Sequence, residues 1–534
     1  MASGDGETSD GERASSRGGA SGDNRASDGG RASGGDRASG GDRASGGDRA
    51  SGDGRARADG GTRAADGGLQ DRAVRALAGA LPQPFWTSQP GAPAPAPALT
   101  GPLTADLAVV GGGFSGLWTA LLARERDPSA DVVLIEADTT GWAASGRNGG
   151  FCSASLTHGI GNGLARFPGQ MALLEKLGAQ NLAEIGETIA ARGIDCGFSP
   201  VGELTIATQP WQLDDLHGET VAARRLGHDV TELDAAGVRR ELDSPTFLGG
   251  AWYRDTCAMV DPARLARGLR QACLDAGVRL FEHTRVRAIA DDGAGLALIT
   301  PYGRVRARQA ALATGAYKPL LRRLGNFFVP VYDYVLVTEP LSAAQLASLG
   351  WRNRQGAADS GNQFHYFRLT DDDRVLWGGY DAVYFNGGRV SPAHDQRPET
   401  FARLAGHFFT TFPQLEDVAF EYAWGGAIDT CSRFFAFYGT ARRGRLGYAC
   451  GHTGLGVGAS RFAANVVLDL LSGQRTERTE LELVRSRPVP FPPEPARSAV
   501  VQLTRASLAR ADRDAGRRNL WLRTLDRLGL GFDS

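Results

Sequence analysis

Hydrophobic and polar positions near residue 110 predict two parallel strands joined by a helix. Leu107–Val110 is a short apolar run, and residues 117–126 then carry helix formers with apolar residues at helical spacing. Residues 131–136 form a second apolar run that ends in an acid, Glu136. Strand, helix and strand in this order predict a βαβ unit at the start of an α/β fold.

A second helix and strand of the same kind are expected further along the chain. Residues 261–276 have the pattern of an amphipathic helix, with Asp261 as N-cap and Pro262 at the first position. Residues 278–281 follow as a parallel strand. Downstream of Val331, the segments YDYVLVTEP, QFHYFRL and RVLWGG are strand-like. The chain is therefore expected to build an α/β domain with an interleaved, mainly antiparallel β-sheet domain.

Three glycines stand between the first strand and its helix in a G-x-G-x-x-G spacing. Gly111 allows the tight turn, Gly113 lets the backbone approach a pyrophosphate, and Gly116 lets helix and strand pack closely. Glu136 follows Gly116 by 20 residues, where this motif expects a carboxylate for a ribose hydroxyl. The unit predicts a Rossmann-type dinucleotide site, with NAD and FAD both open. Its expected contacts are Gly111, Gly113, Phe114, Ser115, Gly116 and Glu136.

Composition and charge exclude several classes of protein. The chain has 534 residues, of which 42% are hydrophobic, so more than one domain with a core is expected. The net charge is −1, which argues against a nucleic-acid partner. Six scattered cysteines without a C-x-x-C pair predict reduced thiols in a cytoplasmic protein and no metal site. Neither a secretory signal nor a transmembrane segment is expected, because no long apolar run occurs.

Both ends of the chain differ from the middle in composition. Residues 1–68 repeat the hexamer RASGGD, offer almost nothing to bury, and are expected to be disordered. Their alternating Arg and Asp favour a solvated polyampholyte over an arm that binds nucleic acid. Residues 476–534 are basic and partly helical, a pattern that fits a membrane surface, a partner, or docking on the protein itself. Interspersed acids such as Asp512 and Asp514 favour docking on the protein itself.

Three further segments join the first glycine motif in a familiar order. Ser145–Gly150 follows the acid, Ala313–Gly315 ends an apolar strand, and Gly454–Gly456 opens a helix near the end of the fold. This order resembles the FAD-dependent amine and amino-acid oxidoreductase superfamily, which includes D-amino-acid, glycine and sarcosine oxidases. The segments PALTGPLTADLAVVGGGFSGLWTALLA and GWAASGRNGG look most like the branch of γ-glutamylputrescine oxidoreductases. The resemblance spans about Phe85 to Leu471.

The resemblance implies FAD as the cofactor, and no second nucleotide-binding unit for NAD is recognisable downstream. A helix N-terminus after Gly456 would favour negative charge on the ring, although small residues also suit any strand-to-helix connection. Arg147 could equally be a salt-bridged loop residue, and burial in a strand would explain Val286 equally well. The further contacts implied for FAD are Ser145, Arg147, Asn148, Gly149, Val286, Thr314, Gly315, Gly454, Leu455 and Gly456.

The resemblance and the composition together imply five parts of the chain. The FAD-binding and substrate domains interleave, since each is built from separate segments. The parts are a disordered tail (1–68), an extended lead-in (69–104), an FAD-binding domain (105–200, 255–325, 440–475), a substrate domain (201–254, 326–439) and a basic helical extension (476–534).

Two departures from the family concern the way FAD is held. Some relatives tether the flavin through a His in a T-W-H-A-A-type stretch, but here Trp142 is followed by Ala143. Others use a cysteine in the last third of the chain, and the nearest one here, Cys431, is several residues out of register. We therefore expect FAD to be bound noncovalently.

Aromatic residues of the β-sheet domain are the candidates for contact with the substrate. Tyr366 falls where sarcosine-oxidase relatives place a tyrosine near the substrate, and His365 beside it could titrate near neutral pH. Trp377 stands where those relatives carry an oxygen-activating lysine, so O₂ and another electron acceptor both remain open. Each of these side chains could instead belong to the core, as aromatic residues and satisfied histidines often do.

The expected function is oxidation of a C–N bond of a small amine or amino acid by hydride transfer to flavin. A γ-glutamylputrescine-like amine is the substrate that the resemblance suggests, while the sequence leaves the substrate and the oligomeric state open. One alternative is a flavoprotein without turnover that acts as a sensor. Another is a dehydrogenase of a different substrate class with an acceptor other than O₂.

Overall fold

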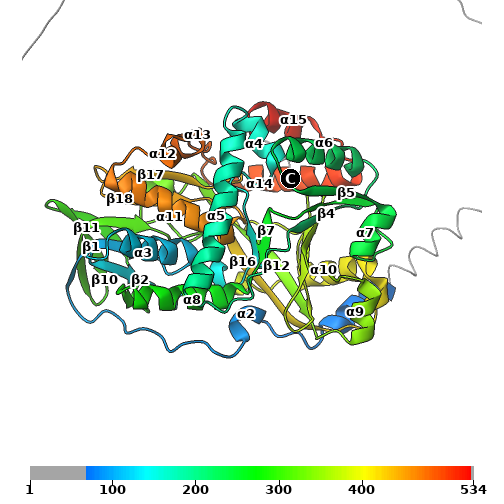
Figure 1. The fold of residues 1–534 in the computed structure, drawn as a ribbon, viewed down its shortest axis with the longest axis horizontal. Helices are drawn as coiled ribbons and strands as arrows, with labels where there is room; N and C mark the ends of the chain where they lie inside the picture. Colours follow the sequence, from blue (N-terminus) through cyan, green and yellow to red (C-terminus); the bar gives the residue numbers. More distant parts are fainter. Residues whose placement is uncertain (1–67, 531–534) are drawn as a thin grey trace, which may run out of the picture. The chain divides into compact units, whose positions relative to one another are not determined.

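Two large β-sheets organise residues 68–530, the part of the chain that the computed structural model describes (Figure 1). Each of these sheets has eight strands, and a two-stranded sheet of β3 (Phe151–Ser153) and β7 (Cys257–Met259) accompanies them. The expected disordered tail over residues 1–68 lies outside the described residues, apart from its last position.

The first sheet contains the parallel strands that the glycine motif predicted. Its order is β17-β18-β11-β1-β2-β8, and only β17 in this path is antiparallel to its neighbour. β9 and β10 extend it as an antiparallel meander on β11. The strands are β1 (Leu103–Val110), β2 (Val132–Ile135), β8 (Arg279–Phe281), β9 (Ala288–Asp292), β10 (Gly295–Thr300), β11 (Gly303–Leu312), β17 (Phe437–Ala441) and β18 (Leu446–Cys450).

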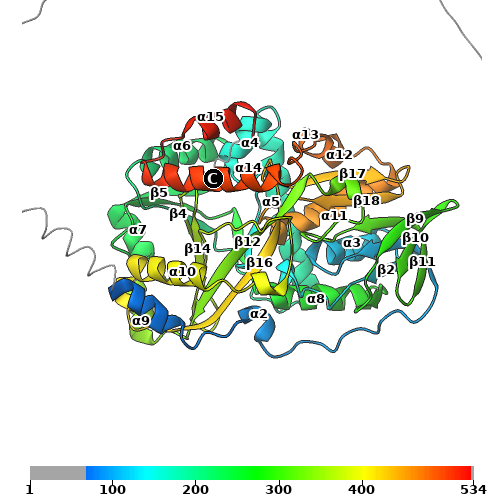
Figure 2. The ribbon, with the colours of Figure 1, turned by 180° about the vertical axis from the view of Figure 1, so that it is seen from behind.

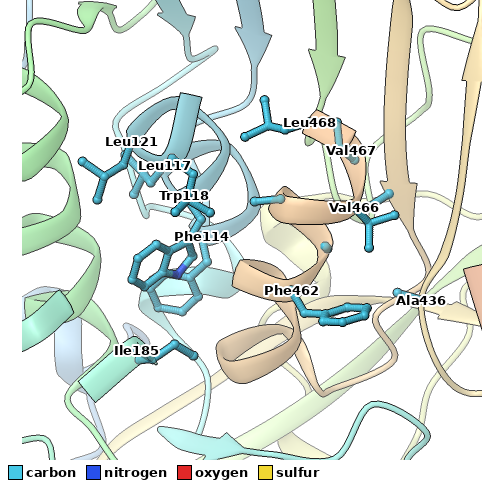
Figure 3. Close-up of a cluster of buried hydrophobic side chains, with 14 of the residues drawn as sticks. Phe114, Leu117, Trp118, Leu121, Ile185, Ala436, Phe462, Val466, Val467 and Leu468 are labelled. Atoms are coloured by element: carbon cyan, nitrogen blue, oxygen red, sulfur yellow. The ribbon is translucent and has the colours of Figure 1, made fainter. Parts of the chain in front are cut away.

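Helices cover one face of this sheet because alternate strand residues point to opposite sides. Leu107, Val109 and Leu134 pack into one core with α3 (Phe114–Arg126) and α11 (Gly456–Ser472). Figure 3 shows this packing, in which Leu117, Trp118 and Leu121 of α3 lie near Phe462, Val466 and Val467 of α11, and Ile185 of α5 (Met171–Ala191) adjoins them. Ala108, Val110 and Val133 point the other way and pack with the meander.

The second predicted helix begins where its capping residues place it. α8 (Pro262–Asp275) has Asp261 as its N-cap, whose side chain accepts a hydrogen bond from Arg264 N at 2.9 Å. Proline at the first helical position loses no hydrogen bond, because that N–H has no partner in a helix. β8 then pairs in parallel with β2, as expected.

The second sheet is mainly antiparallel, as the sequence predicted. Its order is β16-β12-β15-β14-β13-β4-β6-β5, and the pairing of β13 with β4 is its single parallel contact. The strands are β4 (Glu203–Ala207), β5 (Val230–Asp234), β6 (Gly249–Tyr253), β12 (Phe328–Thr338), β13 (Gly356–Asp359), β14 (His365–Leu369), β15 (Val375–Gly379) and β16 (Phe420–Cys431).

One face of the second sheet is a closed aromatic core. Tyr334, Phe367 and Trp377 pack there with Phe408 and other residues of α10 (Pro398–Thr411). Tyr366 alternates with Phe367 along β14 and therefore points to the opposite face. That opposite face is the one that lines the cavity described below.

Several short elements escaped the sequence patterns. α7 (Ala235–Glu241) and α9 (Ala343–Leu349) are single short helices, each started by a capping side chain, Asp234 and Ser342 respectively. β11 is one long strand from residue 303 to residue 312. It is continuous because β1 pairs along its length while β10 and β18 pair with its two ends.

The C-terminal extension packs on the rest of its own chain, as its interspersed acids predicted. It contains α12 (Glu477–Glu480), α13 (Glu482–Arg485), α14 (Ala496–Arg513) and α15 (Leu520–Arg527). Both views place α14 beside α6 (Gln212–Arg225) and β5 (Figure 2). Arg505 of α14 forms an ion pair with the buried Asp381 at 2.9 Å. Within residues 68–530, no helix has the length and apolar character needed to cross a membrane.

Candidate active site

A large cavity lies between the two sheets. Its volume is about 1390 Å³, and its lining comes from the carboxyl ends of β1, β2 and β11 and from the facing strands β4, β12, β14 and β16. Sites for drug-sized ligands measure about 300–1,000 Å³. The cavity is therefore large enough for a dinucleotide together with a second small molecule.

The glycine turn after β1 has no room for side chains. Gly111 adopts a φ of +110°, and a Cβ there would lie 2.2 Å from the carbonyl oxygen of Ala313. A Cβ on Gly116 would lie 1.8 Å from Gly111 O, so this glycine is required for close contact between the turn and α3. Gly113 directly precedes the N-terminus of α3, whose free N–H groups attract phosphate. The turn therefore has the form that the glycine spacing predicted.

Glu136 is a buried carboxylate at the end of β2. Its side chain accepts hydrogen bonds from Gly112 N at 2.6 Å, Asp138 N at 2.8 Å and Trp142 Nε1 at 3.0 Å. Burial raises its pKa, while these donors act in the opposite direction. The carboxylate thus holds the glycine turn and still borders the cavity.

The loop after Glu136 is held by its own side chains. Ser145 Oγ accepts from Phe114 N at 2.9 Å, and Asn148 Oδ1 accepts from Gly150 N at 2.8 Å. Arg147 forms an ion pair with Asp395 at 2.7 Å, as in the alternative interpretation of Arg147 as a salt-bridged loop residue. All three side chains also line the cavity.

The C-terminal turn reaches the cavity from the opposite side. Gly454 has a φ of +88°, and α11 begins at Gly456, so the first N–H groups of α11 adjoin the cavity. His452 lies 3.5 Å from both Asp429 Oδ2 and Ser115 Oγ, which joins this turn to α3. No sequence motif singles out His452 or Asp429, so neither could be recognised from the sequence.

The substrate-side wall carries a tyrosine and an aspartate in direct contact. Tyr366 Oη donates to Asp333 Oδ2 at 2.5 Å, and both side chains line the cavity. Burial raises the pKa of Asp333 to about 6, even though the hydrogen bond from Tyr366 favours the charged form. The ring of Tyr366 is wedged between Gly149 and Gly378, where a Cβ on either glycine would lie 2.6 Å from it.

Asp333 was also missed from the sequence, although a signal was present. In the segment YDYVLVTEP it stands as an acid between Tyr332 and Tyr334 in an otherwise apolar strand. Strand alternation turns both tyrosines toward the aromatic core, where Tyr332 also borders the cavity, and turns Asp333 toward the cavity. An isolated acid of this kind in a buried strand is a candidate functional residue.

Two of the expected substrate contacts lie on the other face of the sheet. Trp377 is 1% exposed and packs against Phe367 and Phe412, because it pairs with Phe367 rather than with Tyr366 across β14 and β15. His365 is stacked on Trp377 with ring centroids 4.7 Å apart, and its Nδ1 lies 2.6 Å from Asp359 Oδ2. Neither Trp377 nor His365 lines the cavity, so the structure does not bring them to it.

The other expected contacts fall into two groups. Gly116 packs against the turn behind the cavity and does not line it. The remaining candidates are brought together around one space. These lining residues are Gly111, Gly113, Phe114, Ser115, Glu136, Ser145, Arg147, Asn148, Gly149, Val286, Thr314, Gly315, Gly454, Leu455, Gly456 and Tyr366.

A family model described as "FAD dependent oxidoreductase" matches residues 106–470, and the chain belongs to this family. Its relatives include the γ-glutamylputrescine oxidoreductase of Escherichia coli, 33% identical over 400 residues, which are 71% of this chain and 86% of that one. A probable oxidoreductase, OrdL, of Haemophilus influenzae is 27% identical over 71% of this chain and 85% of its own length.

Solved structures support the same fold. The crystal structure of glycine oxidase from Geobacillus kaustophilus superimposes with a TM-score of 0.60 at 22% identity, covering 72% of this chain and all of that one. The C-terminal extension beyond residue 470 lies outside the family match, although Thr504 and Leu508 of α14 line the cavity.

FAD is the cofactor of this family, and the observed site fits it. The glycine turn and the N-terminus of α3 present backbone N–H groups for a pyrophosphate, and Glu136 stands at the position for a ribose hydroxyl. The Ser145–Gly149 loop lines the cavity beside Tyr366, and the N-terminus of α11 lines the same cavity, so both offer polar groups to the cofactor. The individual contacts to FAD stay predictions.

Proposed function

We propose that the protein oxidises a C–N bond of a small amine or amino acid, with a γ-glutamylputrescine-like amine as the leading candidate. The observation that carries the proposal is the contact between Tyr366 and Asp333 on the cavity wall beside Gly149. The 33% identity with a γ-glutamylputrescine oxidoreductase supports the substrate type.

The reaction removes two electrons from the substrate. FAD, when bound, supplies the acceptor for a hydride from the carbon next to the nitrogen. The amine nitrogen also loses a proton, and the resulting imine reacts with water to give a carbonyl compound and ammonia or a smaller amine. The protein must therefore bind the ammonium form, accept its proton and keep the reacting carbon in place.

Asp333 is suited to the first two of these tasks. Its carboxylate pairs with the incoming ammonium and takes the proton that must leave before the nitrogen lone pair can assist the reaction. An alkyl ammonium has a pKa of about 10.4 and an ordinary aspartate one of about 3.9. A pKa of about 6 narrows this gap by about two units, which makes Asp333 about 100-fold better as a proton acceptor.

Tyr366 positions the Asp333 carboxylate. Its hydroxyl donates to one carboxylate oxygen, while Gly149, Gly378 and the ring of Phe151 fix its own ring. The Tyr366–Phe151 ring centroids are 5.7 Å apart at an interplanar angle of 81°. Aromatic rings on this wall exclude water, and they hold the reacting carbon at one place.

An anaerobic screen tests the proposal. The yellow holoprotein is mixed without oxygen with γ-glutamyl amines, diamines, N-methyl amino acids and D-amino acids, and its absorbance is followed. Rapid bleaching by at least one amine or amino acid is expected. A yellow protein that none of these compounds bleaches would contradict the proposal and favour a sensing flavoprotein without turnover.

Noncovalent attachment of FAD can be tested separately. Burial raises the pKa of the Cys431 thiol, which donates to the carbonyl oxygen of Phe435 at 3.1 Å. A neutral thiol that is engaged in this way is a poor nucleophile. All the flavin colour is expected in the supernatant after acid precipitation, and colour in the pellet would contradict this expectation.

A further inference from the structure

Glu203 is an acid of the cavity wall whose charge has no partner in the described part of the chain. It lies at the start of β4, and its half-buried side chain opens into the cavity. Among residues 68–530, no hydrogen bond or ion pair is made by its carboxylate. Enclosure by protein raises its pKa to about 7, and no neighbouring cation offsets this effect. A buried carboxylate normally has a partner, so this one points to a cationic ligand.

The surroundings of Glu203 also favour a positive charge. Tyr253, its cross-strand partner on β6, and Glu219 of α6 line the same part of the cavity. Burial raises the pKa of Glu219 as well, and the nearby Asp215 adds to this effect. Trp211 lines the cavity too, and its buried Nε1 has no hydrogen-bond acceptor within residues 68–530. Carboxylates and aromatic rings together are typical of sites for ammonium groups.

The basic residues of the cavity lining are either engaged or lie elsewhere. Arg147 is paired with Asp395, Arg505 with Asp381, and Arg518 with Asp526. His228 lies 3.0 Å from Glu175 and 3.3 Å from Asp255. The other arginine and lysine of the lining, Arg285 and Lys318, belong to the first-sheet side, next to Val286 and close to Gly315. Of the other lining histidines, His452 lies 3.5 Å from Asp429 Oδ2, and burial lowers the pKa of His158, which disfavours its charged form. A substrate carboxylate near Glu203 would therefore meet negative charge.

A continuous wall connects Glu203 with Tyr366. Tyr366 pairs with Ala358, Ala358 pairs with Thr205, and Glu203 lies two residues before Thr205 on β4. All four side chains line the cavity, and the two between the ends are small. Two strand spacings across and two residues along correspond to about 12 Å between the Cα atoms of Tyr366 and Glu203. This span suits an elongated molecule with one functional group at each end.

We propose that Glu203 binds a second, distal ammonium group of the substrate while the reacting amine lies at Asp333. The proposal rests on the proposed amine oxidation and narrows its substrate class to diamines, polyamines and other amines with a cationic far end, in preference to γ-glutamyl amines, whose far end also carries a carboxylate. An ion pair with Glu203 fixes the far end, and so determines which carbon of a long, flexible molecule lies beside Tyr366. Glu203 would thus determine which long amines are oxidised and at which carbon.

Matched amine pairs test this role in the holoprotein. Each α,ω-diamine, from 1,4-diaminobutane to 1,8-diaminooctane, is compared with the linear monoamine that has the same number of carbons. At least one diamine is expected to bleach the flavin at a concentration about 10- to 100-fold lower than its monoamine. Glu203→Gln should remove this preference and leave the monoamine response within about twofold, while Glu203→Asp should restore part of it.

A control and a binding measurement separate the possible outcomes. Glu187→Gln removes one exposed acid of α5 outside the cavity and should leave the preference for diamines unchanged. Calorimetry with 1,8-diaminooctane measures binding even if no bleaching occurs. If no amine bleaches the flavin, the proposed reaction is contradicted. If 1,8-diaminooctane nevertheless binds and Glu203→Gln abolishes this binding, the ammonium site is supported. A diamine preference that Glu203→Gln retains, or the absence of diamine binding, would overturn the ammonium site itself.

Discussion

At the scale of single residues, the proposed function depends on two acids of the cavity wall, Asp333 and Glu203. Carboxylates are rarely enclosed by protein unless they are paired, because enclosure penalises their charge. Asp333 has neutral partners, the hydroxyl of Tyr366 and the backbone N–H groups of Tyr334 and Gly379, and Glu203 has none among the described residues. Both have raised pKa values as a result. Each is therefore suited to form an ion pair with a cationic group of a ligand.

Replacement of Asp333 tests its role as proton acceptor. Asp333→Asn should lower the rate of flavin bleaching about 100-fold or more, because the amide cannot take the proton. Tyr366→Phe should have a smaller effect, about 10-fold, since it removes a positioning hydrogen bond. Stopped-flow absorbance under anaerobic conditions measures both rates. Equal rates in Asp333→Asn and the unmodified protein would exclude this role.

The pH profile provides a second check on Asp333. The unprotonated carboxylate is the active form, so kcat/KM should rise as the pH increases through about 6. Tyr366 is the titratable group that contacts Asp333, and burial keeps its pKa well above the ordinary value, so it stays neutral in this range. The rise near pH 6 should be absent in Asp333→Asn. A variant that keeps the rise would assign it to another group.

Glu203 should affect stability as well as specificity. Its pKa is about 7 in the folded protein against an ordinary value of 4.5, so the folded state holds its proton longer than the unfolded state. The stability contributed by this group is full below pH 4.5 and is lost as the pH rises to about 7. The titratable groups Tyr253 and Cys257 interact with it, and Glu219 interacts with Tyr253. The difference in Tm between Glu203→Gln and the unmodified protein, measured without ligand, should shift in favour of the variant as the pH rises from 5 to 8.

At the scale of elements, strand alternation decides which residues reach the cavity. Tyr366 and Asp333 lie on one face of the second sheet, and Trp377 and His365 on the other. The sequence alone grouped these residues because it shows that aromatics cluster in neighbouring strands. It does not show the register between strands, which places Trp377 opposite Phe367 instead of Tyr366. Register follows from long-range pairing and is not encoded locally.

The close packing of the turn between β1 and α3 can be tested by substitution. Gly116→Ala would place a Cβ 1.8 Å from Gly111 O, so the turn must shift and the N-terminus of α3 must move. The variant should purify with little FAD, as measured by the ratio of flavin to protein absorbance. Gly406→Ala in α10 is the matched control, because a Cβ there meets no atom within 4 Å. This control should retain FAD and gain about 0.5–1 kcal/mol in stability.

At the scale of the whole molecule, the C-terminal extension completes the cavity. Thr504 and Leu508 of α14 contribute to its lining. Asp512 of the same helix accepts hydrogen bonds from Asn362 N at 2.9 Å and Gln363 N at 3.0 Å, in the loop between β13 and β14. These hydrogen bonds therefore fix α14 and the loop to each other on the substrate side of the cavity.

Loss of this anchor should loosen the cover of the cavity. Asp512→Ala is expected to raise KM about 3- to 10-fold with little change in kcat, because the contacts it removes position the cavity wall and take no part in the reaction. It should also speed proteolytic cleavage within α14. Asp514→Ala, at the C-cap of α14, removes only an exposed pair with Arg510 and should change neither quantity. An unaltered KM in Asp512→Ala would show that the cover is held by other contacts.

Local patterns in the sequence predicted the βαβ units, the glycine turn and the start of α8, because these depend on neighbours along the chain. Glu136 and the loop around Arg147 were also recognised from motifs. Asp333, Glu203 and His452 were not recognised, because each becomes significant only through the strand or turn that faces it across the cavity. The role of α14 could not be predicted either, since its contact with the loop at Asn362 joins residues 150 positions apart.

The central claim is that the protein oxidises a C–N bond by two electrons at the wall formed by Asp333 and Tyr366. The most direct measurement is an anaerobic single turnover of the holoprotein with an excess of the best amine, followed by assay of carbonyl product and released ammonia. One carbonyl group and one ammonia (or smaller amine) are predicted for each flavin bleached, with at least 100-fold slower formation in Asp333→Asn. Bleaching without carbonyl product, or product at an unchanged rate in Asp333→Asn, would contradict the account.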